Sequence, residues 1–126
     1  QMHAILSDTR RTPADRLRDL ATTFLRSECE EAAIRRALDD AAPLYRDAPE
    51  AQAARARVND ALAAFMREAL PEADDARRAL TGEVIMRTLK SVGKDYSETP
   101  QSPAAVEAFG QALGEMLVGY LDRCRG

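Results

Sequence analysis

Apolar residues recur every three to four positions along most of the chain, and that spacing places them on one face of an α-helix. Prolines and helix-capping residues divide the pattern into five helical segments. The first is a short segment within 1–8, and the longer ones begin near Thr12, Pro49, Asp74 and Ser102. The pattern therefore predicts an all-α fold, an antiparallel helical bundle.

The segment that begins at Thr12 starts with a typical helix signal, because Thr12 can cap the first turn and Pro13 suits the first helical position. Further along, residues 27–30 read Ser-Glu-Cys-Glu, which is the spacing of a second capping box. We therefore expect a break or bend at 27–30, followed by a fresh helix start.

The last two segments carry features that suggest an additional packing neighbour. The apolar stripe of the 74–96 helix covers roughly 200°, whereas a simple surface helix needs only roughly 100°. In the last segment, Gly110 and Gly114 lie on the shoulder of the stripe, and each costs about 1 kcal/mol relative to alanine. Close approach of another backbone would offset that cost, although the glycines can also be tolerated without a role. The short polar turn over 97–102 predicts an antiparallel hairpin.

The composition supports a helical protein with one domain. The chain has 126 residues, of which 45% are hydrophobic and 5% are aromatic, and it contains no Trp. Strong helix formers dominate, and the β-branched and aromatic runs expected of strands are missing. This length suffices for a single core, and no interior linker is long enough to divide the chain in two.

The charge pattern argues against a nucleic-acid surface on this chain. Its 21 acidic and 18 basic residues alternate closely and leave a net charge of −3, whereas DNA binding requires a basic stripe. Cys29 and Cys124 lie far apart without metal-type spacing, which is typical of a reducing compartment. No apolar run approaches the roughly 18 residues of a membrane span. We therefore expect a cytoplasmic protein with no membrane contact.

Motifs that carry catalytic chemistry are absent from the sequence. It contains no P-loop, no G-x-G-x-x-G, no H-E-x-x-H and no C-x-x-C. His3 is the lone histidine, and the acidic pairs 30–31 and 74–75 fall in expected first turns, where negative charge favours the helix dipole. We therefore expect no enzyme, no metal site and no cofactor.

Several large apolar residues, including soft methionines, come from three different helices. They can fill a plain core or line an apolar ligand cavity, and the sequence leaves both interpretations open. Polar residues at the stripe edges would complete such a cavity. The candidates for a ligand pocket are Phe24, Tyr45, Arg55, Asn59, Leu62, Phe65, Met66, Met86 and Leu89.

The order of these segments resembles a known family. The stub helix is followed by TPADRLRDLATTFLRSE, APEAQAARARVNDALAAFMREALPEADDARRAL, VIMRTLKSVGKDYSE and SPAAVEAFGQALGEMLVGYLDR. This succession resembles the C-terminal regulatory domain of tetracycline-repressor (TetR) family transcriptional regulators. The resemblance covers essentially the whole chain.

The resemblance implies a division of roles. Residues 1–8 would be the end of a helix linking to an N-terminal helix-turn-helix domain that this chain lacks, and residues 9–126 would be the regulatory domain. A small, largely apolar effector would control a repressor, and operator DNA would be bound only through the missing domain. The last two helices would form a homodimer. The candidates for its interface are Ile85, Val92, Phe109, Gly110, Leu113, Gly114, Met116, Leu117 and Tyr120.

A second hypothesis stays open at this point. The same pattern of helices fits a self-contained helical-bundle interaction protein with no DNA role. Such a protein would begin natively at Met2, which follows Gln1 in the sequence.

Overall fold

The computed structural model describes residues 1–38 and 49–125. This part of the chain contains five α-helices and no strand. The predicted all-α bundle is therefore confirmed. The helices are α1 (Met2–Ser7), α2 (Pro13–Ala37), α4 (Pro49–Ala69), α5 (Asp75–Ser97) and α6 (Pro103–Arg125).

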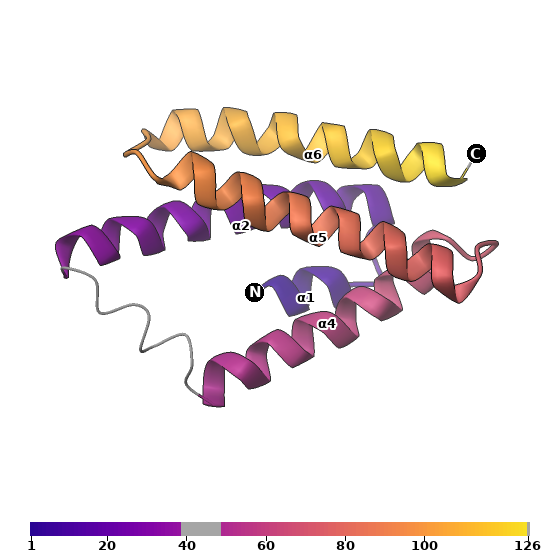
Figure 1. The fold of residues 1–126 in the computed structure, drawn as a ribbon. Coiled ribbons are helices and arrows are strands. Elements are labelled where there is room, and N and C mark those ends of the chain that lie inside the picture. Colours follow the sequence, from indigo (N-terminus) through magenta and orange to yellow (C-terminus); the bar gives the residue numbers. More distant parts are fainter. Residues whose placement is uncertain (39–48, 126) are drawn as a thin grey trace.

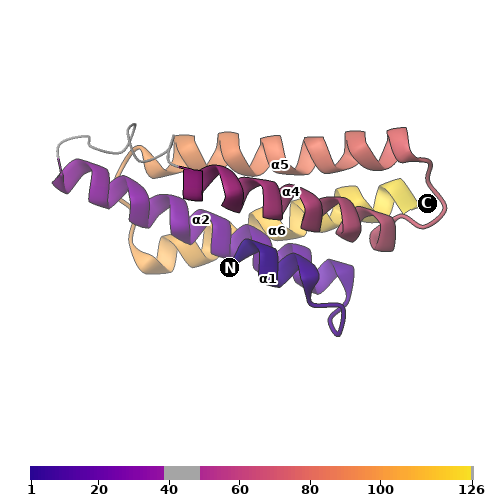
Figure 2. The same ribbon diagram turned by 90° about the horizontal axis from the view of Figure 1, so that it is seen from below.

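The helices lie in three levels (Figure 1). α6 lies above α2 and α5, and α1 and α4 lie below them. Figure 2, seen from below, shows α1 and α4 in front of the other helices. α5 and α6 run in opposite directions on either side of a short turn, as predicted. α6 nevertheless contacts α2 far more extensively than it contacts α5, and α2 also packs against α5. The additional neighbour of the last two helices is therefore α2 of the same chain.

The predicted break at 27–30 is wrong, because α2 continues from Pro13 to Ala37. Leu25 and Ala32 lie seven residues apart on the same side of this helix, and both are buried. Packing of that continuous side against the bundle overrides the local capping signal, which is a common outcome when tertiary contacts and propensity disagree.

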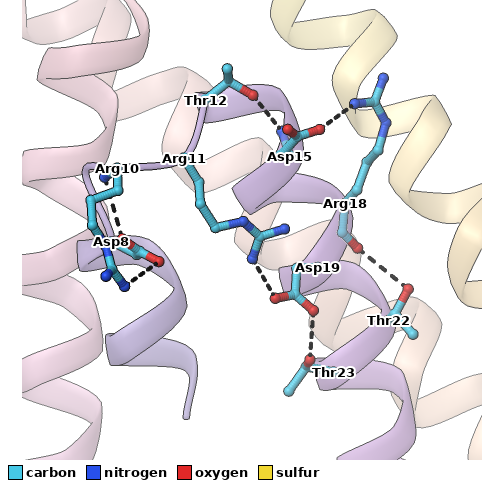
Figure 3. A network of polar contacts seen from close by, with 9 residues as sticks. All are labelled: Asp8, Arg10, Arg11, Thr12, Asp15, Arg18, Asp19, Thr22 and Thr23. Atoms are coloured by element: carbon cyan, nitrogen blue, oxygen red, sulfur yellow. Dashed lines mark hydrogen bonds and ion pairs between the residues drawn. The ribbon is translucent and has the colours of Figure 1, made fainter.

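Helix starts follow the predicted capping residues. The side chains of Thr12, Asp74 and Ser102 each accept a hydrogen bond from the backbone N–H three residues later, at 3.1, 2.8 and 3.1 Å. Figure 3 shows the bond of Thr12 at the start of α2. Each such cap contributes typically about 1 kcal/mol.

The core lies where all five helices meet. Leu6 of α1, Phe65 of α4 and Leu89 of α5 are each at most 1% exposed. They belong to one cluster of buried residues to which α2 and α6 also contribute. Among the other members are Leu17, Leu20, Ala21, Met66, Ile85, Leu117 and Leu121.

Candidate functional site

The candidate pocket residues separate into a closed core and an open cleft. Phe65, Met86 and Leu89 are buried members of the core cluster, and Phe24 packs against that cluster from α2. A Cβ added at Gly93 would lie 2.9 Å from the Phe24 ring, so this glycine makes room for the ring against α5. These four candidates fill space between helices.

Three other candidates line a cleft between α4 and α5, which we call the α4–α5 cleft. Asn59, Leu62 and Met66 form its α4 side, and its volume is about 290 Å³. Gly82 lies on the α5 side, where a Cβ would be 3.3 Å from Cγ of Met66. The missing side chain therefore lets α5 approach α4 closely. The remaining lining residues are Ala63, Arg67, Asp75, Arg78, Ala79 and Glu83.

The α4–α5 cleft has an apolar floor and a charged rim. Leu62 and Met66 supply the floor, and the rim carries side chains of both signs. Arg78 on the rim is held by the backbone, because its Nε donates to the carbonyl of Leu70 and its Nη2 to the carbonyl of Pro71, both at 2.9 Å. This arginine therefore caps the C-terminal end of α4.

Two candidate pocket residues remain. Arg55 is exposed on α4 and does not line the α4–α5 cleft. Tyr45 lies outside the described residues.

A larger open hollow of about 800 Å³ lies where the start of α2, the α4–α5 turn and the end of α6 meet. Pro13, Glu68, Leu70 and Cys124 are among the residues that line it. Arg125 of α6 also lines it and donates from Nε to the carbonyl of Ala69 at 3.0 Å. Sequence reasoning did not predict this hollow, since it forms only where three distant segments converge.

Arg16 is a further residue that sequence reasoning missed. It is completely buried, and its Nη2 lies 2.7 Å from Oε1 of Glu68. The available signal was its position in an apolar stripe, because Arg16 lies four residues before Leu20 and next to Leu17. An arginine at such a position is rarely fully buried unless it is paired.

Two of the candidate interface residues are glycines whose close neighbour belongs to the same chain. A Cβ at Gly110 would lie 3.0 Å from Cα of Thr22, and one at Gly114 would lie 3.1 Å from Cα of Arg18. The backbones of α6 and α2 therefore meet at these glycines. Three further interface candidates, Ile85, Leu113 and Leu117, are also buried within the chain.

Two interface candidates on α6 are exposed instead, namely Phe109 at 39% and Met116 at 56%. On α5, Leu80 is 56% exposed and Val84 is 37% exposed, although sequence reasoning had named neither for the interface. Together Leu80, Val84, Phe109 and Met116 define what we call the α5–α6 apolar face. The remaining candidates, Val92 and Tyr120, are partly buried against the core.

Two side-chain contacts join α5 to α6. The rings of Tyr96 and Phe109 are stacked, with their centroids 4.2 Å apart. Towards the other end of the pair, Oγ1 of Thr81 lies 3.9 Å from Sγ of Cys124. α5 and α6 therefore approach each other near both ends of the hairpin.

The two cysteines are free and partly buried. Burial raises the pKa of the Cys29 thiol, and the nearby carboxylate of Glu28 raises it further. Such a thiol is mostly protonated near neutral pH, which is the unreactive form.

Within residues 1–38 and 49–125, no group of three or more His, Cys, Asp or Glu side chains is arranged to hold a metal ion. In the same part of the chain, no helix combines the length and the apolar character needed to cross a membrane. His3 lies exposed on α1.

Comparison with known proteins assigns a family to nearly the whole chain. Residues 12–124 match the family described as "Tetracyclin repressor-like, C-terminal domain". This match spans α2, α4, α5 and α6. No curated protein matches the chain.

Proposed function

The chain belongs to the tetracycline repressor-like C-terminal domain family, and on that premise we propose that it is the effector-binding and dimerisation domain of a transcriptional repressor. In this proposal the DNA-reading helix-turn-helix domain precedes α1, which is the end of the linking helix. The regulator acts in the cytoplasm, has no catalytic role and needs no cofactor.

The observation that carries the dimerisation half of the proposal is the α5–α6 apolar face. Four large apolar side chains are exposed on these two helices, and a gathering of exposed apolar side chains often marks an interaction surface. In a symmetric dimer the same patch of each subunit faces its copy, so two hairpins of α5 and α6 would meet as four helices. We assign Phe109 and Met116, two exposed apolar residues of α6, to this proposed interface.

The α4–α5 cleft is the proposed effector site. Its volume of about 290 Å³ is near the lower end of the range for small-molecule pockets, which favours a small ligand. The apolar floor of Leu62 and Met66 would bury the ligand, and Asn59 on the rim would orient it. A small, largely apolar molecule with one polar group is therefore the expected effector class.

A thermal-shift screen of small lipophilic compounds tests the site. A ligand present at 100 times its Kd stabilises the domain by about 2.7 kcal/mol. Ala63→Glu places a charged side chain in the cleft, and Ala56→Glu makes the same change at an exposed position of α4 outside the cleft. We expect the ligand-induced shift to vanish in Ala63→Glu and to persist in Ala56→Glu. Equal loss or equal retention in the two variants would place the ligand elsewhere.

A further inference from the structure

Arg16 of α2 is completely buried and contacts two other helices. Its Nη1 donates a hydrogen bond to the backbone carbonyl of Leu6 at 2.9 Å. Its Nη2 lies 2.7 Å from Oε1 of Glu68, and its guanidinium carbon lies 5.2 Å from the centroid of the Phe65 ring. Leu6 belongs to α1, whereas Phe65 and Glu68 belong to α4. One side chain of α2 therefore links α1 to α4.

The guanidinium of Arg16 is incompletely satisfied. Among the described residues its Nε has no hydrogen-bond partner, and Nη2 meets Glu68 as an ion pair without an aligned hydrogen bond. The Glu68 side chain is 39% exposed, so water competes for its carboxylate. A buried cation with so few hydrogen bonds depends strongly on each partner that it has. The position of Arg16 is therefore sensitive to the position of Glu68.

The end of α1 is held in place by its packing against α2 and α4. α1 is held by Leu6, which is buried, and by the partly buried Met2 and Ile5. The carbonyls of its last turn lack donors within the helix, and Arg16 supplies a donor to one of them, that of Leu6. Removing that donor would loosen the C-terminal end of α1.

α4 connects this arrangement to the proposed effector site. Met66 lines the α4–α5 cleft, and Glu68 follows two residues later on the same helix. A displacement of α4 at the cleft therefore moves Glu68 as well. We infer that Arg16 is a positioning residue that couples α4 to α1, so that Glu68 on α4 determines, through Arg16, how firmly the carbonyl of Leu6 is held. In the proposed function α4 lines the effector cleft and α1 leads to the DNA-binding domain, and the inference rests on that function only for this connection.

Amide hydrogen exchange measured by NMR on the chain without ligand tests the coupling. Glu68→Gln removes the charge that holds Arg16, and we expect the amides of 5–8 to exchange about tenfold faster. The amide of Leu117 in α6 should keep its rate, because the coupling is local to α1. In an Arg16→Met background, where α1 is already released, Glu68→Gln should add nothing. The control is Glu72→Gln, the same change at an exposed carboxylate just beyond α4, which should leave every rate unchanged.

Four results would overturn the inference. The first is an unchanged rate at 5–8 in Glu68→Gln, a variant whose overall stability is checked by the rate at Leu117. The second is equal acceleration at 5–8 and at Leu117, which would mean general destabilisation. The third is an acceleration at 5–8 in Glu72→Gln as large as that in Glu68→Gln. The fourth is a further acceleration at 5–8 when Glu68→Gln is added to Arg16→Met. Because no effector or DNA is present, failure here leaves the proposed function standing, and failure of that function leaves the measured coupling intact.

Discussion

Gly110 of α6 touches the backbone of α2 at Thr22, since a Cβ on the glycine would lie 3.0 Å from Cα of Thr22. One turn later Gly114 meets Arg18 in the same way. Ion pairs from Arg18 to Glu115 and from Arg26 to Glu107 flank the contact. The two helices are therefore packed at backbone distance along this stretch.

Gly110→Ala is expected to destabilise the domain. The added methyl group meets main-chain atoms that cannot move away as a flexible side chain would, and overpacking of this kind costs about 1–3 kcal/mol. The gain in helix propensity of about 1 kcal/mol offsets part of that cost. Urea unfolding followed by circular dichroism measures the net change.

Gly119→Ala is the matched control, because a Cβ at Gly119 has nothing within 4 Å. At this position only the higher helix propensity of alanine matters, and we expect stabilisation by up to about 1 kcal/mol. If both variants shift the free energy of unfolding in the same direction, close packing of α6 on α2 does not explain Gly110.

Asp8, the C-cap of α1, should titrate at unusually low pH. Hydrogen bonds from the Arg10 side chain lower the pKa of Asp8 below its ordinary value of about 3.9. A carboxyl group whose pKa is depressed by folding contributes stability above its unfolded pKa and loses that contribution as the pH falls through the folded value. A carboxyl-detected NMR titration gives the pKa directly.

Arg10→Ala should return the pKa of Asp8 towards the ordinary value. Arg11→Ala should change it little, because the Arg11 guanidinium pairs with Asp19 instead (Figure 3). If the pKa of Asp8 stays the same in Arg10→Ala, the hydrogen bonds from Arg10 are not the cause of the lowered pKa.

Cys29 should react slowly with iodoacetamide in the folded chain. Burial raises the pKa of its thiol, so less of the reactive thiolate is present at mildly alkaline pH. In a Cys124→Ser background the rate reports Cys29 alone, and it should rise several-fold when urea unfolds the chain. Equal rates with and without urea would show that the thiol is not protected by the fold.

The sequence predicted the fold well where local signals decide the outcome. Thr12, Asp74 and Ser102 mark helix starts because a capping side chain acts on its own first turn. Residues 27–30 carry an equally good local signal, yet α2 runs through them because Leu25 and Ala32 pack on one continuous side. That packing partner lies far away in sequence, so a local pattern cannot report it.

The candidate sites depended more on such long-range contacts. A broad apolar stripe shows that α5 has several neighbours, but it does not show which neighbour each residue contacts. The sequence therefore predicts Ile85 in the dimer interface, whereas the structure buries Ile85 in the core of the single chain. The stripe likewise does not reveal that Leu80 and Val84 are exposed on α5. Arg16 was missed because interspersed arginines are usually solvated, and only its contacts with α1 and α4 distinguish it.

The central claim is that the α5–α6 apolar face joins two copies of this chain. Met116→Glu places a charge on that face at a position 56% exposed in the single chain, so folding of the protomer should not suffer. Gln111→Glu makes the same change at an exposed position on another side of α6 and serves as the control.

Sedimentation velocity at tens of micromolar compares the three proteins most directly. We predict about twice the 13.8 kDa mass of one chain for the unaltered protein and for Gln111→Glu, and a single-chain mass for Met116→Glu. A single-chain mass for the unaltered protein, or a dimer that Met116→Glu leaves intact, would contradict the account.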